Sequence, residues 1–167
     1  KSIISLHKQD DELNVAYPGR VFSETDEDQE SLKYIQRFLD VTKSDMFFAK
    51  GVILVEGISE QLLMPEFAKI LDKDLIDSHI SVINIGGRYF NHFLKLFNSK
   101  NENTINKKVA CLTDLDPVKK KKVKGSSWEK ALPYELGYDD EYQYNECSNN
   151  ALSLYDDSIK NIKFFSQ

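Results

Sequence analysis

The sequence predicts an α/β fold: a Rossmann-like parallel sheet of about four strands, flanked by helices, with an N-terminal hairpin and helix appendage. Three observations support this prediction. Apolar β-branched runs alternate along the chain with segments whose apolar residues recur at helical spacing. Glycine or an acidic residue follows most of these runs, where a strand would end. The length of 167 residues is enough for one domain with its own core and a smaller appendage.

The N-terminal region is predicted to form the appendage. Ser2–His7 and the alternation from Leu13 to Tyr17 predict two strands of a hairpin. The acidic segment Ser23–Glu30 predicts a loop or linker. From Ser31 onward, apolar residues recur every three or four positions, which predicts a helix. Asp45–Phe48 either continue this helix or form a second short one.

The rest of the chain is predicted to form the sheet and its helices. The strands of the sheet are expected at Val52–Gly57, Ile80–Ile85, Lys108–Thr113 and Asn161–Phe165. Helices are expected between them: one capped by Ser59 and either kinked or tightened in its first turns by Pro65, one at Phe90–Phe97 and one at Asn150–Tyr155. A long polar stretch follows at Pro117–Gly125, and short helices are expected at Trp128–Tyr144.

Composition limits the classes of protein. With 41% hydrophobic and 29% charged residues, the chain has the composition of a folded domain, and no apolar run is long enough to cross a bilayer. We therefore expect a cytoplasmic protein that does not contact the membrane. The net charge of −5 argues against a basic nucleic-acid binder. It remains compatible with a DNA enzyme whose clustered carboxylates hold divalent cations.

Acidic residues follow two of the predicted strands. Glu56 ends one strand, Asp114 and Asp116 follow another, and Glu60 lies four residues beyond Glu56. Sites form at the carboxyl ends of parallel strands, so these carboxylates are expected to converge. Mutual repulsion would then favour bound Mg²⁺ or Mn²⁺, which prefer oxygen ligands. If the strand continued, Asp114 and Asp116 would point to one face and hold two ions that act on a phosphodiester.

A simpler interpretation of each acidic residue stays open. Aspartate favours turns and caps, so Asp114 and Asp116 could have a local structural role. A glutamate in the first turn of a helix, such as Glu60, is stabilised by the helix dipole without any metal.

The surrounding motifs resemble a known family. VILVEGISE at Val52–Glu60 and CLTDLD at Cys111–Asp116 resemble the two acidic motifs of the Toprim domain. The phrases LVEGISEQLLMP and SVINIGGRYF resemble the version found in the OLD (overcoming lysogenization defect) family. That family joins an ABC-type ATPase to a C-terminal Toprim nuclease, and the resemblance covers the chain from about Ser31 to its end.

The resemblance implies a Mg²⁺- or Mn²⁺-dependent DNA endonuclease that hydrolyses phosphodiester bonds by two-metal chemistry. Its catalytic residues would be Glu56, Asp114 and Asp116. Glu56 and Glu60 would bind one ion, and Asp114 and Asp116 the other or both. Gly57 would permit a sharp turn from strand to helix.

The resemblance also implies a surface for DNA. Gly86 and Gly87 would keep the rim open for a phosphate or the DNA backbone, and Arg88 could contact phosphate or only pair with a carboxylate. Lys119 and Lys120 follow the aspartate pair and could contact phosphates, although a solvated loop is an equal alternative. The nearby aromatic residues could stack on bases or pack in a small subdomain: Trp128 and the tyrosines from Tyr134 to Tyr144.

The same resemblance predicts a fragment. Residues 1–30 would be the end of the preceding ATPase domain with a linker, and residues 31–167 a Toprim domain truncated at its C-terminus. The family usually adds a further acidic motif and a lysine after the fourth strand, but here the sequence stops at Phe164–Gln167. We expect weak or no activity from the chain alone. The expected partners are DNA, the ATPase domain of the same polypeptide, and a second copy in a full-length homodimer.

Other classes of protein share some of these sequence features. A non-catalytic regulatory or assembly module could keep the same fold. Response-regulator receivers and dehalogenase-like phosphatases also gather acidic residues on a parallel sheet. They place them after the first strand, whereas here the aspartate pair follows the third, so both are disfavoured.

Overall fold

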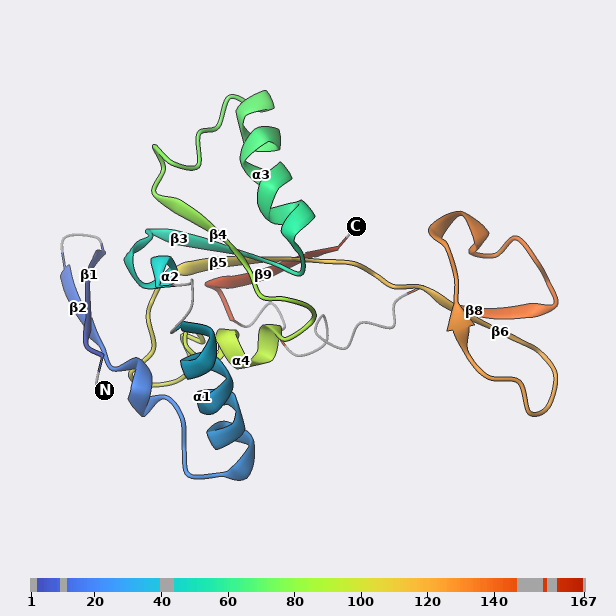
Figure 1. The fold of residues 1–167 in the computed structure, drawn as a ribbon, viewed down its shortest axis with the longest axis horizontal. Helices are drawn as coiled ribbons and strands as arrows, with labels where there is room; N and C mark the ends of the chain where they lie inside the picture. The colour runs from blue at the N-terminus through green and yellow to red at the C-terminus, as the bar shows by residue number, and fades with distance from the viewer. Residues whose placement is uncertain (1–2, 10–11, 40–43, 147–154, 156–158, 167) are drawn as a thin grey trace.

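The centre of the molecule is a parallel sheet of four strands (Figure 1). The computed structural model describes residues 3–9, 12–39, 44–146, 155 and 159–166. The strand order is β4-β3-β5-β9, and every neighbouring pair is parallel. These strands are β3 (Gly51–Val55), β4 (Ile80–Asn84), β5 (Lys108–Thr113) and β9 (Ile162–Ser166). The predicted fold class is therefore confirmed.

One face of the sheet carries the hydrophobic core. Figure 1 shows α1 (Asp26–Leu39) and α4 (Phe90–Leu94) on this side, and α3 (Ile58–Ile70) on the other. Alternate strand residues such as Leu54 and Cys111 point into the core and are fully buried. The bulkiest fully buried side chains come from the segment around α4: Phe90, Phe93 and Phe97. This layer holds the strands in place and so fixes where their ends lie.

The opposite face of the sheet is much less covered. No residue of α3 is buried, although the helix lies against β3 and β4. The helix runs through Pro65 without interruption. Its apolar side chains are largely exposed, as is Phe165 of β9 at 54%. The apolar packing of the sheet is therefore one-sided.

In the N-terminal appendage, the predicted hairpin is present but the predicted linker is shorter than expected. Strands β1 (Ser5–Gln9) and β2 (Glu12–Ala16) pair antiparallel, followed by the short helix η1 (Pro18–Arg20). The prediction of a loop through Glu30 is wrong, because α1 already begins at Asp26. Its acidic first turn is favoured by the positive end of the helix dipole. The alternative of a second short helix after α1 is confirmed as α2 (Asp45–Phe48).

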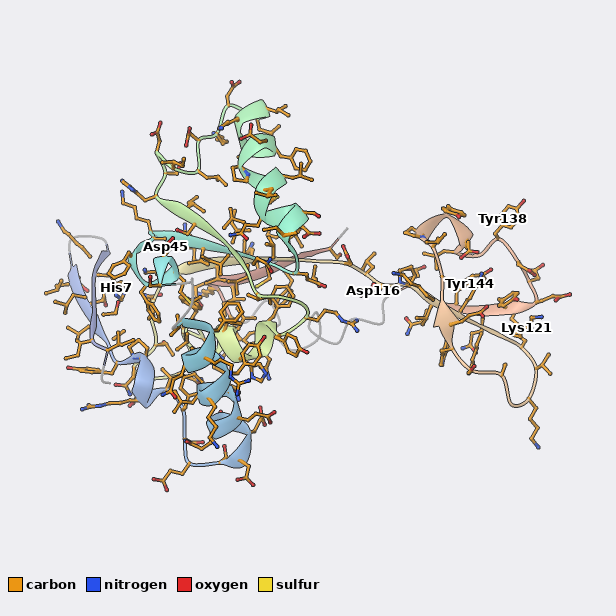
Figure 2. All side chains as sticks on the ribbon, viewed as in Figure 1. His7, Asp45, Asp116, Lys121, Tyr138 and Tyr144 are labelled. Atoms are coloured by element: carbon orange, nitrogen blue, oxygen red, sulfur yellow. The ribbon has the colours of Figure 1, made fainter. Side chains whose placement is uncertain are left out.

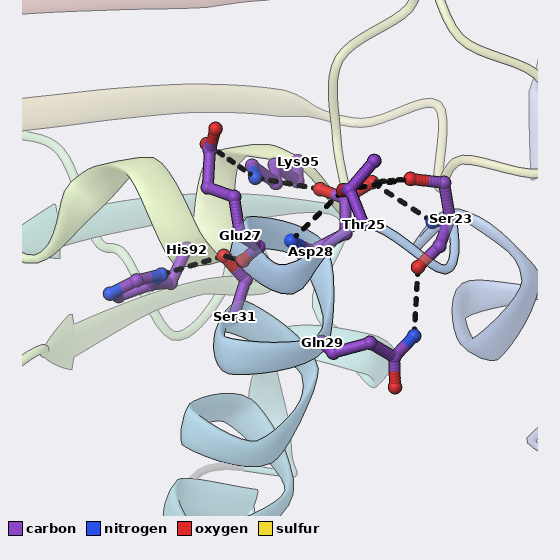
Figure 3. A network of polar contacts seen from close by, with 8 residues as sticks. All are labelled: Ser23, Thr25, Glu27, Asp28, Gln29, Ser31, His92 and Lys95. Carbon is purple, nitrogen blue, oxygen red and sulfur yellow. Dashed lines mark hydrogen bonds and ion pairs between the residues drawn. The ribbon is translucent and has the colours of Figure 1, made fainter.

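A polar network holds α1 against α4 (Figure 3). Lys95 Nζ lies 2.9 Å from Glu27 Oε1 and 2.7 Å from Asp28 Oδ1. The backbone N–H of Ser23 also donates to Asp28 Oδ2, at 2.9 Å. The hydrogen bonds from Lys95 and then Ser23 lower the pKa of the Asp28 carboxyl from 3.8 to about 2. The network therefore stabilises the fold through the ionised carboxylate.

Replacing Asp28 with asparagine should make the fold less sensitive to acid. Because the folded pKa lies below the unfolded value, the stabilisation is complete above about pH 3.8 and is lost as the pH falls toward 2. We expect Asp28→Asn to lower the free energy of unfolding by about 1 kcal/mol at pH 7, since solvent screens this partly exposed pair. The urea midpoints of the wild type and of Asp28→Asn between pH 2 and pH 5 measure this difference. The same dependence of the midpoint on pH in both proteins would contradict the prediction.

A small antiparallel sheet extends away from the parallel sheet and follows Asp116 directly. This arm consists of β6 (Val118–Lys121), β7 (Glu129–Lys130), η2 (Pro133–Glu135) and β8 (Tyr142–Asn145), in the sheet order β7-β6-β8. It projects from one end of the molecule (Figure 1). The solvated loop considered for the lysine run is therefore wrong where β6 forms. The short helices predicted for Trp128–Tyr144 are confirmed only at η2, since strands β7 and β8 form on either side of it. The lysine run forms a strand because it pairs with the alternating tyrosines of β8.

The helix predicted at Asn150–Tyr155 lies outside the described residues, apart from Tyr155 itself. Within the described part of the chain, no helix has the length and apolarity required to cross a bilayer.

Candidate functional site

The carboxyl ends of β3 and β5 meet through Glu56. The two strands are neighbours in parallel register, with Val55 opposite Leu112, so the residues that follow them lie side by side. Glu56 Oε1 accepts a hydrogen bond from the Thr113 hydroxyl and one from the backbone N–H of Asp114, the latter at 3.3 Å. The glutamate from one strand thus contacts the start of the aspartate segment from the next. The sequence did not single out Thr113, although its place just before Asp114 was the available signal.

Gly57 makes room for Glu60 rather than providing an unusual backbone angle. Its φ of −134° and ψ of 175° are extended values that any residue adopts, so the expected need for glycine in a sharp turn is wrong. A Cβ at Gly57 would lie 2.8 Å from Glu60 Oε2. The missing side chain therefore lets the Glu60 carboxylate fold back toward the turn. Helix α3 begins at Ile58, so the predicted cap at Ser59 is also wrong.

The double glycine after β4 does need its backbone freedom. Gly86 has φ +74° and Gly87 has φ +127°, which side-chain-bearing residues rarely adopt. Two hydrogen bonds hold the turn: Gly86 N donates to Asn84 Oδ1 at 2.7 Å, and Gly87 N donates to Glu56 O at 2.8 Å. The turn is thereby attached to the backbone of the same glutamate that contacts β5.

The aspartate pair does not continue the strand. Strand β5 ends at Thr113, and Asp116 has a left-handed φ of +48°. The condition for Asp114 and Asp116 to share a face of an extended strand is therefore not met. Asp116 Oδ2 instead lies 3.3 Å from Arg88 Nη1, which links the double-glycine turn to the aspartate segment. Figure 2 shows Asp116 where the chain leaves the parallel sheet for the arm.

The donor set suits a hard divalent cation, but the side chains are not arranged around one. All four predicted ligands are carboxylates, and Mg²⁺ and Mn²⁺ favour such oxygen ligands. Among the described residues, no three histidine, cysteine, aspartate or glutamate side chains are close enough together to hold one ion. Glu56 and Asp116 instead contact Thr113 and Arg88. A cation bound by Asp116 would compete with Arg88 for this carboxylate.

The two predicted lysines lie on opposite faces of the arm. Lys119 Nζ pairs with Glu135 Oε1 at 2.7 Å, and this hydrogen bond raises the pKa of Lys119. Lys120 lies on the other face, with its ammonium 4.7 Å from the centre of the Trp128 ring. Trp128 itself is 44% exposed. Lys119 therefore helps to hold the arm together, whereas Lys120 and Trp128 present charge and a flat ring to solvent.

Comparison with known proteins identifies the central part of the chain. Residues 47–116 match the family described as "Overcoming lysogenization defect protein-like, TOPRIM domain". This segment contains β3, α3, β4, α4 and β5 with all four carboxylates. No curated protein is significantly similar to the chain.

Solved structures of OLD proteins from two organisms illustrate what the chain is similar to. The C-terminal region of the Burkholderia pseudomallei OLD protein is 43% identical over 43% of this chain and 35% of that one, with a TM-score of 0.40. The C-terminal region of the Xanthomonas campestris pv. campestris OLD protein is 24% identical over 74% of this chain and 52% of that one, with a TM-score of 0.45. The chain thus spans about half or less of the solved regions it resembles. Residues 47–116 are thus similar to the Toprim domain of OLD-like proteins.

Proposed function

We propose that the chain is part of a metal-dependent DNA endonuclease, with Glu56, Glu60, Asp114 and Asp116 as ligands of two Mg²⁺ or Mn²⁺ ions. The observation that carries this proposal is the contact between Glu56 and the backbone N–H of Asp114, 58 residues apart in the sequence. It brings acidic residues from two strands to one edge of the sheet. The family match over residues 47–116 adds support from the same segment.

The residues of the chain have separable tasks in this proposal. Bound ions would activate a water molecule and stabilise the leaving oxygen of the phosphodiester. Thr113 and the Asp114 N–H orient the Glu56 carboxylate, and the missing side chain at Gly57 gives Glu60 its position. The side-chain-free turn beside them leaves space for a DNA phosphate, because nothing lies within 4 Å of a Cβ placed at Gly86.

Arg88 is proposed to exchange partners when a cation arrives. Its guanidinium now neutralises Asp116, and the two side chains are 48% and 31% exposed. A cation bound by Asp116 would release Arg88, which could then contact a DNA phosphate through its forked N–H groups.

Replacing Arg88 with glutamine should separate metal binding from DNA binding. The substitution removes a competitor for Asp116, so we expect Mn²⁺ affinity to rise slightly, by at most about fivefold, as befits an exposed pair. DNA affinity should fall at the same time, because a phosphate contact is lost. Calorimetric Mn²⁺ titration and DNA-binding anisotropy measure the two effects. A fall in both affinities would contradict the exchange.

The arm is proposed as a further DNA contact. It starts immediately after Asp116, so DNA at the carboxylates would extend past it. Lys120 offers a charge for phosphates, and the half-exposed Trp128 ring offers a stacking surface. The proposal also includes an ATPase domain in the same polypeptide, a homodimer of the full-length protein and a cytoplasmic location. The chain alone would have weak activity or none.

A non-catalytic module is the second candidate, and the side-chain pairing favours it. Glu56 and Asp116 already have partners within the protein, so the fold does not depend on a metal to neutralise them. In that case the domain would serve in regulation or assembly.

Metal titration distinguishes the two functions. Mn²⁺ is titrated into the full-length protein by calorimetry, and plasmid cleavage by that protein is followed with Mn²⁺ and with EDTA. Saturable Mn²⁺ binding together with EDTA-sensitive cleavage would support the nuclease. Absence of Mn²⁺ binding at millimolar concentration would overturn it in favour of the module.

A further inference from the structure

A second possible site lies at the opposite end of the sheet from the carboxylates. A cavity of about 700 Å³ opens between the β1–β2 hairpin, α2 and the amino ends of β3 and β5. Its lining combines cationic and aromatic side chains: His7, Lys50, Lys107, Lys108, Phe47 and Phe48. Lys8 also lines it, and no aspartate or glutamate does among the described residues. In a chain of net charge −5, such a lining is a local concentration of positive charge.

His7 faces this cavity without a hydrogen-bond partner. Both ring nitrogens, Nδ1 and Nε2, are buried and have no partner among the described residues. Buried polar atoms nearly always find a partner, so a pair left without one needs an explanation. Burial and the nearby Lys107 charge lower the pKa of His7. An anionic ligand would accept a hydrogen bond from the ring and offset the charge of Lys107.

Lys107 carries a charge that no described carboxylate neutralises. The residue is only 7% exposed. Its ammonium donates to the backbone carbonyls of Met46 and Phe47, at 3.3 and 2.5 Å. Desolvation lowers its pKa to about 8. Asp45, although it begins α2, does not line the cavity. The buried ammonium thus has neutral oxygens as partners and room for an anion beside it.

We propose that this cavity binds a phosphate-bearing ligand of nucleotide size. Its phosphates would lie against Lys50, Lys107, Lys108 and His7, which together supply the charge and the hydrogen-bond donors that a polyphosphate requires. Phe48 is 83% exposed at the rim and offers a flat surface for a base. The volume falls within the range of about 300–1,000 Å³ that small-molecule sites occupy.

The site is separate from the proposed nuclease centre. Lys108 begins β5 and Thr113 ends it, so the strand places the two sites about 17 Å apart at about 3.3 Å per residue. In Figure 2, His7 and Asp116 lie at opposite ends of the parallel sheet. Ligand binding at the lysines therefore needs none of the four carboxylates and no metal ion.

Calorimetry in EDTA tests the proposal with two probes, tripolyphosphate and ATP. Chelating the metals removes any contribution from the carboxylates, so the outcome is independent of the nuclease proposal. The double variant Lys50→Gln/Lys108→Gln removes two exposed charges from the cavity, and Lys33→Gln/Lys73→Gln removes two exposed charges elsewhere as a matched control. We expect both probes to bind the wild-type protein. We also expect the cavity variant to bind at least about tenfold more weakly, and the control to stay within about twofold.

The His7 ring gives a second readout that does not depend on a variant. Tripolyphosphate should shift the ¹H and ¹⁵N resonances of this imidazole as it saturates the site. Tighter binding of ATP than of tripolyphosphate would support a base contact at Phe48. Absence of saturable binding at millimolar probe, equal weakening in the control, or an unmoved His7 ring would each overturn the proposal.

Discussion

Replacing Asp114 with asparagine is expected to reduce Mn²⁺-dependent DNA cleavage by about a hundredfold or more. The change keeps the size of the side chain but removes its negative charge. Even residues that only support metal ligands cost about 10–100-fold when replaced, and a direct ligand should cost at least as much. Plasmid cleavage by the full-length protein at a fixed Mn²⁺ concentration measures the effect, and Glu56→Gln should reproduce it from the neighbouring strand.

A matched control separates the loss of a metal ligand from the loss of a negative charge elsewhere in the domain. Glu66 lies on α3, with a side chain that is 63% exposed and paired with Lys69. Glu66→Gln therefore removes the same charge from the same domain and should leave cleavage unchanged. Mn²⁺ affinity should fall in Asp114→Asn and stay constant in Glu66→Gln. If Asp114→Asn and Glu56→Gln cleaved DNA at the wild-type rate, the assignment of the site would be wrong.

Replacing Phe93 with alanine is expected to destabilise the fold by about 3–5 kcal/mol. Phe93 is fully buried in α4. Its ring packs edge-on against Phe38 and Tyr34 of α1, with centroids 4.7 and 5.9 Å apart. Truncation would leave a cavity between the two helices that cover the sheet. Because this is the side that carries the core, little apolar packing elsewhere can compensate for the loss.

The measurement is the urea midpoint followed by circular dichroism. Phe48→Ala serves as the control, because Phe48 is 83% exposed and its loss should change the free energy of unfolding by no more than about 0.5 kcal/mol. Equal destabilisation by both variants would mean that the core is not located between α1, α4 and the sheet.

The parallel sheet was predictable because its signals are local. A β-branched run such as Val52–Val55 favours a strand, and the glycine or acid after it marks its end. The order of strands and helices then restricts the topology to a few solutions. The same reasoning placed Glu56 and Asp114 at one edge of the sheet, where the structure has them in contact.

Other features depend on partners far away in the sequence and could not be read locally. Lys119 forms part of a strand because Tyr144 pairs with it, which a run of lysines does not indicate. The ion pair of Asp116 with Arg88 depends on a left-handed backbone angle after β5 that no spacing rule predicts. The space that Gly57 leaves for Glu60 likewise depends on the position of the Glu60 carboxylate, which folds back toward the start of α3.

The exposed apolar side chains of α3 affect how future mutagenesis should be interpreted. Leu62 is 66% exposed and Phe67 52%, so exchanging either for a polar residue should hardly alter the unfolding of the chain by itself. Any loss of activity or of assembly from such a change in a cell would therefore report an encounter with another surface, and not a damaged fold.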